Sequence, residues 1–159
     1  MKTIIREGLK KDLPHVLDLI KELAYFENSL NELTITLEDL ERDGFGETSY
    51  FSFLVAENDD MIIGLSFYFT RYSTWKGKFL FLEDFIIKEE FRNQGIGNLL
   101  FEATVDVCRK NNLNGMIWQV LDWNVPAIDF YKKYNASISK EWLNCKLSKD
   151  QINNLKERR

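Results

Sequence analysis

The sequence predicts an α/β layered fold, in which a mixed β-sheet carries helices on both faces. Segments with strand-like and helix-like apolar periodicity alternate along the chain. Three consecutive strand candidates with short links imply antiparallel pairing, whereas a helical crossover after the third predicts a parallel neighbour. A chain of 159 residues is expected to form one domain, spanning residues 1–159.

The N-terminal part is predicted to hold one strand, Thr3–Arg6, and two helices. Asp12 is expected to cap the first helix, with Pro14 in its first turn. Thr36 and Asp39 form a capping box that predicts the start of the second helix. The first helix has an apolar face at helical spacing, made of Leu13, Val16, Leu17, Ile20, Leu23 and Ala24.

Three strand candidates fill the middle of the chain, at Phe51–Glu57, Met61–Phe69 and Lys78–Ile87. The third carries two adjacent acids, Glu83 and Asp84, and leads into the segment Arg92–Gly97 and a helix that ends near Asn111. Glycines before a helix start let backbone N–H groups approach phosphate. The spacing excludes a mononucleotide P-loop, and Leu100 occupies the position of the last glycine of a dinucleotide fingerprint. The pattern R-x-x-G-x-G remains.

The C-terminal part is predicted to contain two strands and two helices. The strands are Gly115–Leu121 and Trp142–Leu147. Asn124 is expected to cap one helix, which carries Pro126 in its first turn, and Ser148 to cap the last helix.

Composition narrows the classes of function. A net charge of -4 and a pI near 5.2 argue against nucleic-acid binding through phosphate neutralisation and suit a cationic substrate. Cys108 and Cys145 lie in no metal-ligand or redox motif, so no metal is expected. The polar N-terminus and the lack of a long apolar run predict a cytoplasmic protein without membrane association.

The order of elements, the R-x-x-G-x-G segment and the pattern Asn-x-Pro-x-x-x-x-Tyr at Asn124–Tyr131 together resemble the GNAT superfamily of N-acetyltransferases over essentially the whole chain. Within it, the chain resembles the diamine acetyltransferase group, which contains spermidine/spermine acetyltransferases and thialysine-acetylating relatives. The segments that carry this closer resemblance are Leu19–Ala24, Asp43–Glu47, Leu82–Phe85 and Trp123–Lys132.

The resemblance implies acetyl-CoA as co-substrate and a GNAT acyl-CoA N-acyltransferase fold. It implies that pantetheine pairs, like an added strand, with the edge formed by Phe85, Ile86 and Ile87. It implies that the pyrophosphate is wrapped by Arg92, Asn93, Gln94, Gly95, Ile96, Gly97 and Asn98. It also implies that the pantetheine arm lies beside Asn124, Val125, Pro126 and Ala127.

The resemblance further implies that Tyr131 is the general acid that protonates departing CoA, and that Glu83 holds the substrate ammonium and passes its proton out through water. Neighbouring strand residues face opposite sides, so Asp84 shares one cleft with Glu83 only if the strand bulges. The implied substrate-binding residues are Phe26, Glu27, Glu83, Asp84, Ile117, Trp118, Gln119 and Glu141. A shortened segment at 135–142 leaves the place of Glu141 open, and Asn135 replaces a customary glycine.

The predicted function is direct transfer of acetyl from acetyl-CoA to a primary amine of a polyamine or diamine, in a ternary complex. Two alternatives stay open. One is the same chemistry on thialysine, a lysine-like small molecule or a protein lysine, and the other is a non-catalytic acyl-CoA-binding sensor. The resemblance also implies a homodimer.

Overall fold

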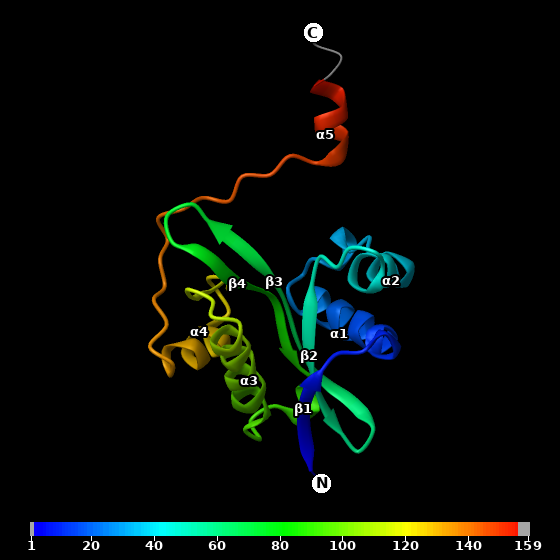
Figure 1. Ribbon diagram of the computed structural model, residues 1–159, viewed down its shortest axis with the longest axis vertical. Helices are drawn as coiled ribbons and strands as arrows, with labels where there is room; N and C mark the ends of the chain where they lie inside the picture. The colour runs from blue at the N-terminus through cyan, green and yellow to red at the C-terminus, as the bar shows by residue number, and fades with distance from the viewer. Residues whose placement is uncertain (1, 156–159) are drawn as a thin grey trace. The chain divides into compact units, whose positions relative to one another are not determined.

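A computed structural model describes residues 2–155 of the chain (Figure 1). The chain divides into two compact units, Met1–Gln119 and Val120–Arg159, which are described in turn. The single domain expected from chain length stays a prediction.

The first unit is built on a five-stranded mixed sheet in the order β1-β2-β3-β4-β5. The strands are β1 (Thr3–Glu7), β2 (Ser52–Asn58), β3 (Met61–Ser73), β4 (Gly77–Ile87) and β5 (Met116–Trp118). Strands β1 to β4 pair antiparallel with their neighbours, and β5 runs parallel to β4. The predicted hairpins and the crossover are therefore confirmed.

Helices cover both faces of this sheet, as Figure 1 shows. They are α1 (Leu13–Phe26), α2 (Leu37–Phe45) and α3 (Ile96–Lys110), with short 3-10 helices η1 (Lys10–Asp12), η2 (Leu30–Glu32) and η3 (Glu89–Phe91). On one face, Val16 and Leu19 of α1 pack in a buried cluster with Ile86 of β4. On the other, Ile96 and Leu100 of α3 pack with Ile87. The predicted fold class is confirmed.

The start of α1 differs from the prediction in one respect. Asp12 occupies the N-cap position, but its side chain makes no capping hydrogen bond. Instead, its two carboxylate oxygens accept hydrogen bonds from the Arg6 guanidinium at 2.7 and 3.0 Å. The carboxylate also accepts from the Leu9 N–H at 2.8 Å. An arginine fork satisfies a carboxylate more strongly than one backbone N–H does, so Asp12 binds the strand rather than its helix.

The capping box at the start of α2 is confirmed: the Thr36 hydroxyl accepts from the Asp39 N–H at 3.1 Å, and the Asp39 carboxylate accepts from the Thr36 N–H at 3.0 Å. His15 is exposed on α1.

The second unit contains α4 (Val125–Lys132) and α5 (Lys149–Asn154), and both predicted caps are confirmed. The Asn124 side-chain oxygen accepts from the Ala127 N–H at 3.3 Å. Ser148 and Gln151 form a reciprocal capping box at the start of α5. Asn135 has a φ of 55°, the left-handed conformation that a glycine would otherwise supply.

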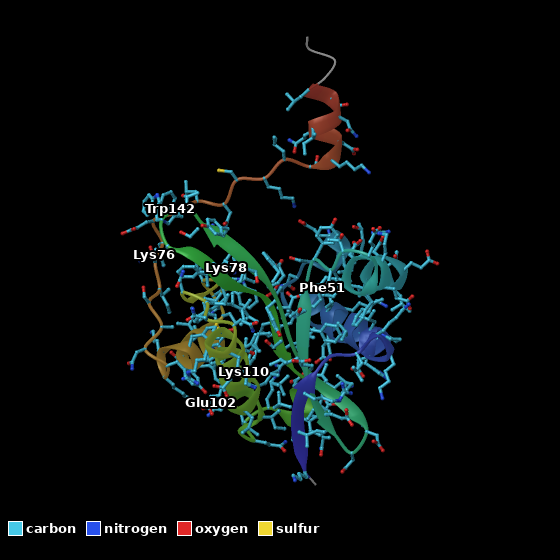
Figure 2. All side chains as sticks on the ribbon, in the orientation of Figure 1. Phe51, Lys76, Lys78, Glu102, Lys110 and Trp142 are labelled. Carbon is cyan, nitrogen blue, oxygen red and sulfur yellow. The ribbon has the colours of Figure 1, made fainter. Side chains whose placement is uncertain are left out.

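The predicted strand at Trp142–Leu147 is wrong, because that segment has no regular secondary structure. Trp142, labelled in Figure 2, and Leu143 are 84% and 88% exposed. A strand exists only through its ladder with a neighbour, and no strand in residues 2–155 pairs with this segment. The strand predicted at Gly115–Leu121 is likewise shorter, since its ladder covers only Met116–Trp118.

Candidate functional site

Strand β4 pairs with β5 over only part of its own length. The parallel ladder joins Leu80 to Met116 and Leu82 to Trp118, and it stops there, although β4 continues to Ile87. The glycine-containing segment follows directly after this last part of β4. Such a strand segment, extended beyond its ladder, is the geometry that allows a ligand to add to a sheet.

A β-bulge in β4 lies where the ladder to β5 ends. In the pairing with β3, Asp84 lies opposite Phe67 and Leu82 lies opposite Tyr68, so Glu83 is the extra residue. Sequence reasoning named a bulge as the condition for both acids to share a cleft, but it could not place one.

The bulge separates the two acids by environment. Asp84 shares a sheet face with Phe67 and Ile86, which pack in the α1 cluster, so its carboxylate lies on the α1 side of the sheet. Glu83 is exposed at the bulge. The predicted order of importance, with Glu83 first, stays a prediction, and of the two acids Asp84 is the less exposed.

The pKa of Asp84 is affected by two neighbouring acids. Burial is the main cause that raises the pKa of Asp84 to about 6, and the neighbouring charges of Glu83 and Glu27 contribute to the same rise. Glu27 is the residue after the last turn of α1, and its own pKa is raised by burial. A partly buried carboxylate with acids beside it favours protonation or an added cation. The arrangement therefore suits an ammonium ligand on the α1 side of β4.

The segment between η3 and α3 presents backbone groups to solvent. Asn93 and Gly95 both adopt left-handed conformations, with φ of 59° and 80°. Nothing lies within 4 Å of the position that a Cβ on Gly95 would take, and Gly95 directly precedes the first turn of α3. A helix start open to solvent, with unpaired first-turn N–H groups, is a place where phosphate binds.

Arg92 stands at the entrance to this segment and is held by two neutral partners. Its Nε donates to the Ile87 carbonyl oxygen at 2.8 Å. Its guanidinium carbon lies 5.8 Å from the centroid of the Phe26 ring, at the end of α1. Within residues 2–155 it makes no ion pair, so its positive charge is not neutralised by a carboxylate. Sequence reasoning placed Phe26 with the substrate, and no sequence signal linked it to Arg92.

The other predicted site residues fall into two groups. Trp118 packs edge-on against Phe101 of α3, with ring centroids 5.6 Å apart, so it lies on the face of the sheet opposite Asp84. In the second unit, Tyr131 is buried, with its ring edge-on to Phe130 at 5.4 Å between centroids. Glu141 is exposed in the segment without secondary structure. The helix start Asn124–Ala127 belongs to this unit as well.

A cavity of about 660 Å³ opens elsewhere in the first unit. Lys78 of β4, Lys110 of α3 and Phe51, all labelled in Figure 2, line it. None of the predicted site residues does. The geometry of strand, bulge and glycine segment, rather than this hollow, marks the candidate site.

Comparisons with known proteins agree with this geometry. The pattern of the Acetyltransferase (GNAT) family matches residues 16–136. A thialysine N-epsilon-acetyltransferase of Bos taurus is 38% identical over 141 residues, which cover 84% of this chain and 83% of that protein. The spermidine/spermine N(1)-acetyltransferase-like protein 1 of Homo sapiens is 35% identical over 139 residues, covering 83% of this chain and 20% of that protein.

Solved structures share the fold. An integron cassette protein from the mobile metagenome of V. cholerae superposes with a TM-score of 0.78 at 21% identity, over 99% of both chains. Within the described part of the chain, no helix is long and apolar enough to cross a bilayer. Nor does any group of three or more His, Cys, Asp or Glu side chains among those residues have the arrangement of a metal site.

Proposed function

Because the chain belongs to the Acetyltransferase (GNAT) family, whose members use acetyl-CoA, we propose that it acetylates a primary amine of a small diamine. The observation that carries this proposal is the acid group of Glu27, Glu83 and Asp84 beside the β4 bulge. A substrate with two ammonium groups needs a carboxylate for each one that leaves water.

Acetyl-CoA is assigned to the last part of β4 and the segment after it. The pantetheine arm is proposed to lie along Phe85, Ile86 and Ile87, beyond the ladder with β5. For the second unit, the family resemblance implies a pantetheine contact at Asn124–Ala127, and this stays a proposal. The pyrophosphate of acetyl-CoA is proposed to bind at Arg92–Asn98. The left-handed Gly95, the first turn of α3 and the charge of Arg92 support this assignment.

The names of the two relatives refer to different amines. The bovine protein is named for thialysine and the human protein for spermidine and spermine, and both lie in the diamine acetyltransferase group. The acid group suits both kinds of amine, because a polyamine and a lysine-like amino acid each carry at least two ammonium groups. The 38% identity to the thialysine enzyme favours a lysine-like amine as the second candidate substrate.

The reaction requires removal of a proton before bond formation. A primary ammonium has a pKa of about 10.4 and no lone pair for attack until it is deprotonated. We propose that Asp84 and Glu27 hold the ammonium groups, that Asp84 accepts the proton, and that Glu83, exposed at the bulge, passes it to water. A carboxylate whose pKa is raised to about 6 is a better base than an ordinary aspartate.

The amine nitrogen then forms its bond to the acetyl carbonyl carbon, and the bond from that carbon to sulfur breaks. The departing thiolate, with a pKa of about 8.5 by analogy with cysteine, takes a proton from an acid. Tyr131 is proposed as that acid. Tyr131 lies two helical turns after Asn124, the residue that caps the start of α4, and this position supports the role.

Thiol release from acetyl-CoA with spermidine, spermine, putrescine, thialysine and lysine tests the proposal. We expect turnover on at least one of these diamines. In Tyr131→Phe, kcat should fall about 100-fold with little change in KM, because general acid catalysis contributes roughly 10²–10⁴ in rate. Tyr134→Phe is the matched control, since the Tyr134 ring also packs against Phe130, at 5.5 Å between centroids, and Tyr134 has no proposed role.

Preference for thialysine over the polyamines would select the second candidate and keep the mechanism. Bound CoA without turnover on any amine would reject the enzyme and support the sensor alternative. The homodimer also stays a prediction, which sedimentation analysis would measure.

A further inference from the structure

The end of α1 meets the phosphate segment through one aromatic ring. Phe26 is the last residue of α1, and its ring lies under the Arg92 guanidinium at 5.8 Å. The ring is 40% exposed, so it lies at the surface rather than in the core. The same guanidinium donates through Nε to the carbonyl of Ile87, the last residue of β4. Arg92 is thus fixed from one side by a strand end and from another by a helix end.

The partners of Arg92 orient it without cancelling its charge. Arg6, Arg42 and Arg109 each form an ion pair with a carboxylate. A carboxylate partner would compete with a phosphate for the guanidinium, whereas a carbonyl oxygen and a ring face stabilise the cation and leave most of its donors available. An arginine held in this way is prepared to bind an anion.

We propose that Phe26 is a positioning residue for Arg92, so that the last turn of α1 helps set the affinity of the site for the phosphates of acetyl-CoA. The inference rests on the proposed function, because it assumes that the segment after Arg92 binds CoA. It moves Phe26 from the amine side of the site, where the family resemblance placed it, to the co-substrate side.

The physical reason is preorganisation. A free arginine side chain populates many rotamers and loses this freedom when it binds a phosphate. The Phe26 ring and the Ile87 carbonyl restrict those rotamers before acetyl-CoA arrives. Part of the entropy loss is then borne by folding rather than by binding, and the affinity for the ligand rises.

The test is calorimetric titration of CoA into wild type, Phe26→Leu and Tyr25→Leu. Leucine keeps an apolar side chain at the helix end but has no ring to hold the cation. We expect Phe26→Leu to raise Kd about two- to fivefold, the range of an exposed cation–π contact. Tyr25 precedes Phe26 and is 74% exposed, so Tyr25→Leu is the matched control and should bind CoA like wild type.

Two further variants separate positioning from a general effect on the fold. Phe26→Trp, which keeps an aromatic face, should restore binding to near the wild-type value. Adding Phe26→Leu to Arg92→Gln should cause no further loss, because both changes remove one interaction. In steady-state assays, the effect should fall on the KM for acetyl-CoA and leave the KM for the amine unchanged.

The inference is overturned if Phe26→Leu binds CoA as wild type does, if its effect is equally large in the Arg92→Gln background, or if the KM for the amine changes instead. Thermal unfolding of each variant checks that it is folded at the assay temperature. These results differ from a failure of the proposed function, in which wild type itself would bind no CoA.

Discussion

The two ends of helix α1 use charge in opposite ways. At the N-terminal end, Arg6 binds Asp12 at 2.7 and 3.0 Å and binds Glu57 through Nε at 2.5 Å. These contacts tie β1, the start of α1 and β2 together. At the C-terminal end, Glu27 lies near Asp84, and Phe26 lies under Arg92. There, within the described residues, acid is placed with acid and the arginine has no carboxylate partner.

The pKa values of two aspartates follow this difference. Hydrogen bonds from Arg6 lower the pKa of Asp12, because they stabilise its ionised form. Burial and neighbouring acids raise the pKa of Asp84 to about 6, because they destabilise its ionised form. Charges that are paired within the chain stabilise the fold. Charges that are left unpaired destabilise it, and such groups gather at functional sites.

The largest loss of stability is expected at the N-terminal end of α1, in the variant Arg6→Gln. Removing one partner of a buried pair costs about 3–5 kcal/mol, and the partly exposed Arg6 should therefore contribute about 2–3 kcal/mol. For a chain of this size, that change lowers Tm by roughly 5–10 °C. Differential scanning calorimetry measures it. Arg42→Gln, at a surface ion pair, is the control and should change Tm by only about 1–2 °C.

If Arg6→Gln were less stable than wild type only at acid pH, the stabilising ion pair assigned to the N-terminal end of α1 would be contradicted. The folded-state pKa of Asp12 is lowered, so its contribution is present above the unfolded value of about 3.9 and disappears as pH falls below it. The difference in Tm between wild type and Arg6→Gln should accordingly be full at pH 7 and shrink below about pH 4.

A smaller effect of opposite sign is expected for Asp84→Asn. The pKa of Asp84 is raised above its unfolded value, so its ionisation destabilises the fold as pH rises from about 4 through 6. Asparagine cannot ionise, and the variant should be more stable than wild type by about 1–2 kcal/mol at pH 8 and equal to it below about pH 4. Its acetyl transfer should fall sharply, because the ammonium loses the carboxylate proposed to hold it.

Glu83→Gln is the matched control, since Glu83 is exposed at the bulge next to Asp84. Its stability at pH 8 should change by less than about 0.5 kcal/mol. Urea unfolding at pH 4 and pH 8 measures both variants. If Asp84→Asn were less stable than wild type at pH 8, the account of the C-terminal end as a destabilised functional site would be wrong.

Features that depend on a few neighbouring residues could be predicted from the sequence. The capping box at Thr36 and Asp39 and the cap at Asn124 act within one turn, so local chemistry determines them. The R-x-x-G-x-G segment likewise predicted a glycine-containing loop before a helix start, and α3 begins directly after Gly95.

Features that depend on a partner far along the chain were missed. The sequence of β4 carries Glu83 and Asp84 side by side, but the bulge exists only in the register with Phe67 and Tyr68 of β3. Asp12 looked like a helix cap because the competing Arg6 comes from another element. The segment at Trp142 had the composition of a strand, but composition cannot supply the neighbour that a ladder requires.

The most direct test of the account is a titration of acetyl-CoA into Arg92→Gln and Arg6→Gln, with Tm measured on the same samples. Loss of an unpaired arginine at the phosphate segment should raise Kd about tenfold or more, as expected for a charge-assisted hydrogen bond, and change Tm by less than about 2 °C. Arg6→Gln should do the reverse, with a lower Tm and wild-type affinity below its unfolding temperature. Equal loss of affinity in both variants, or none in Arg92→Gln, would contradict the assignment of the C-terminal end of α1 to ligand binding.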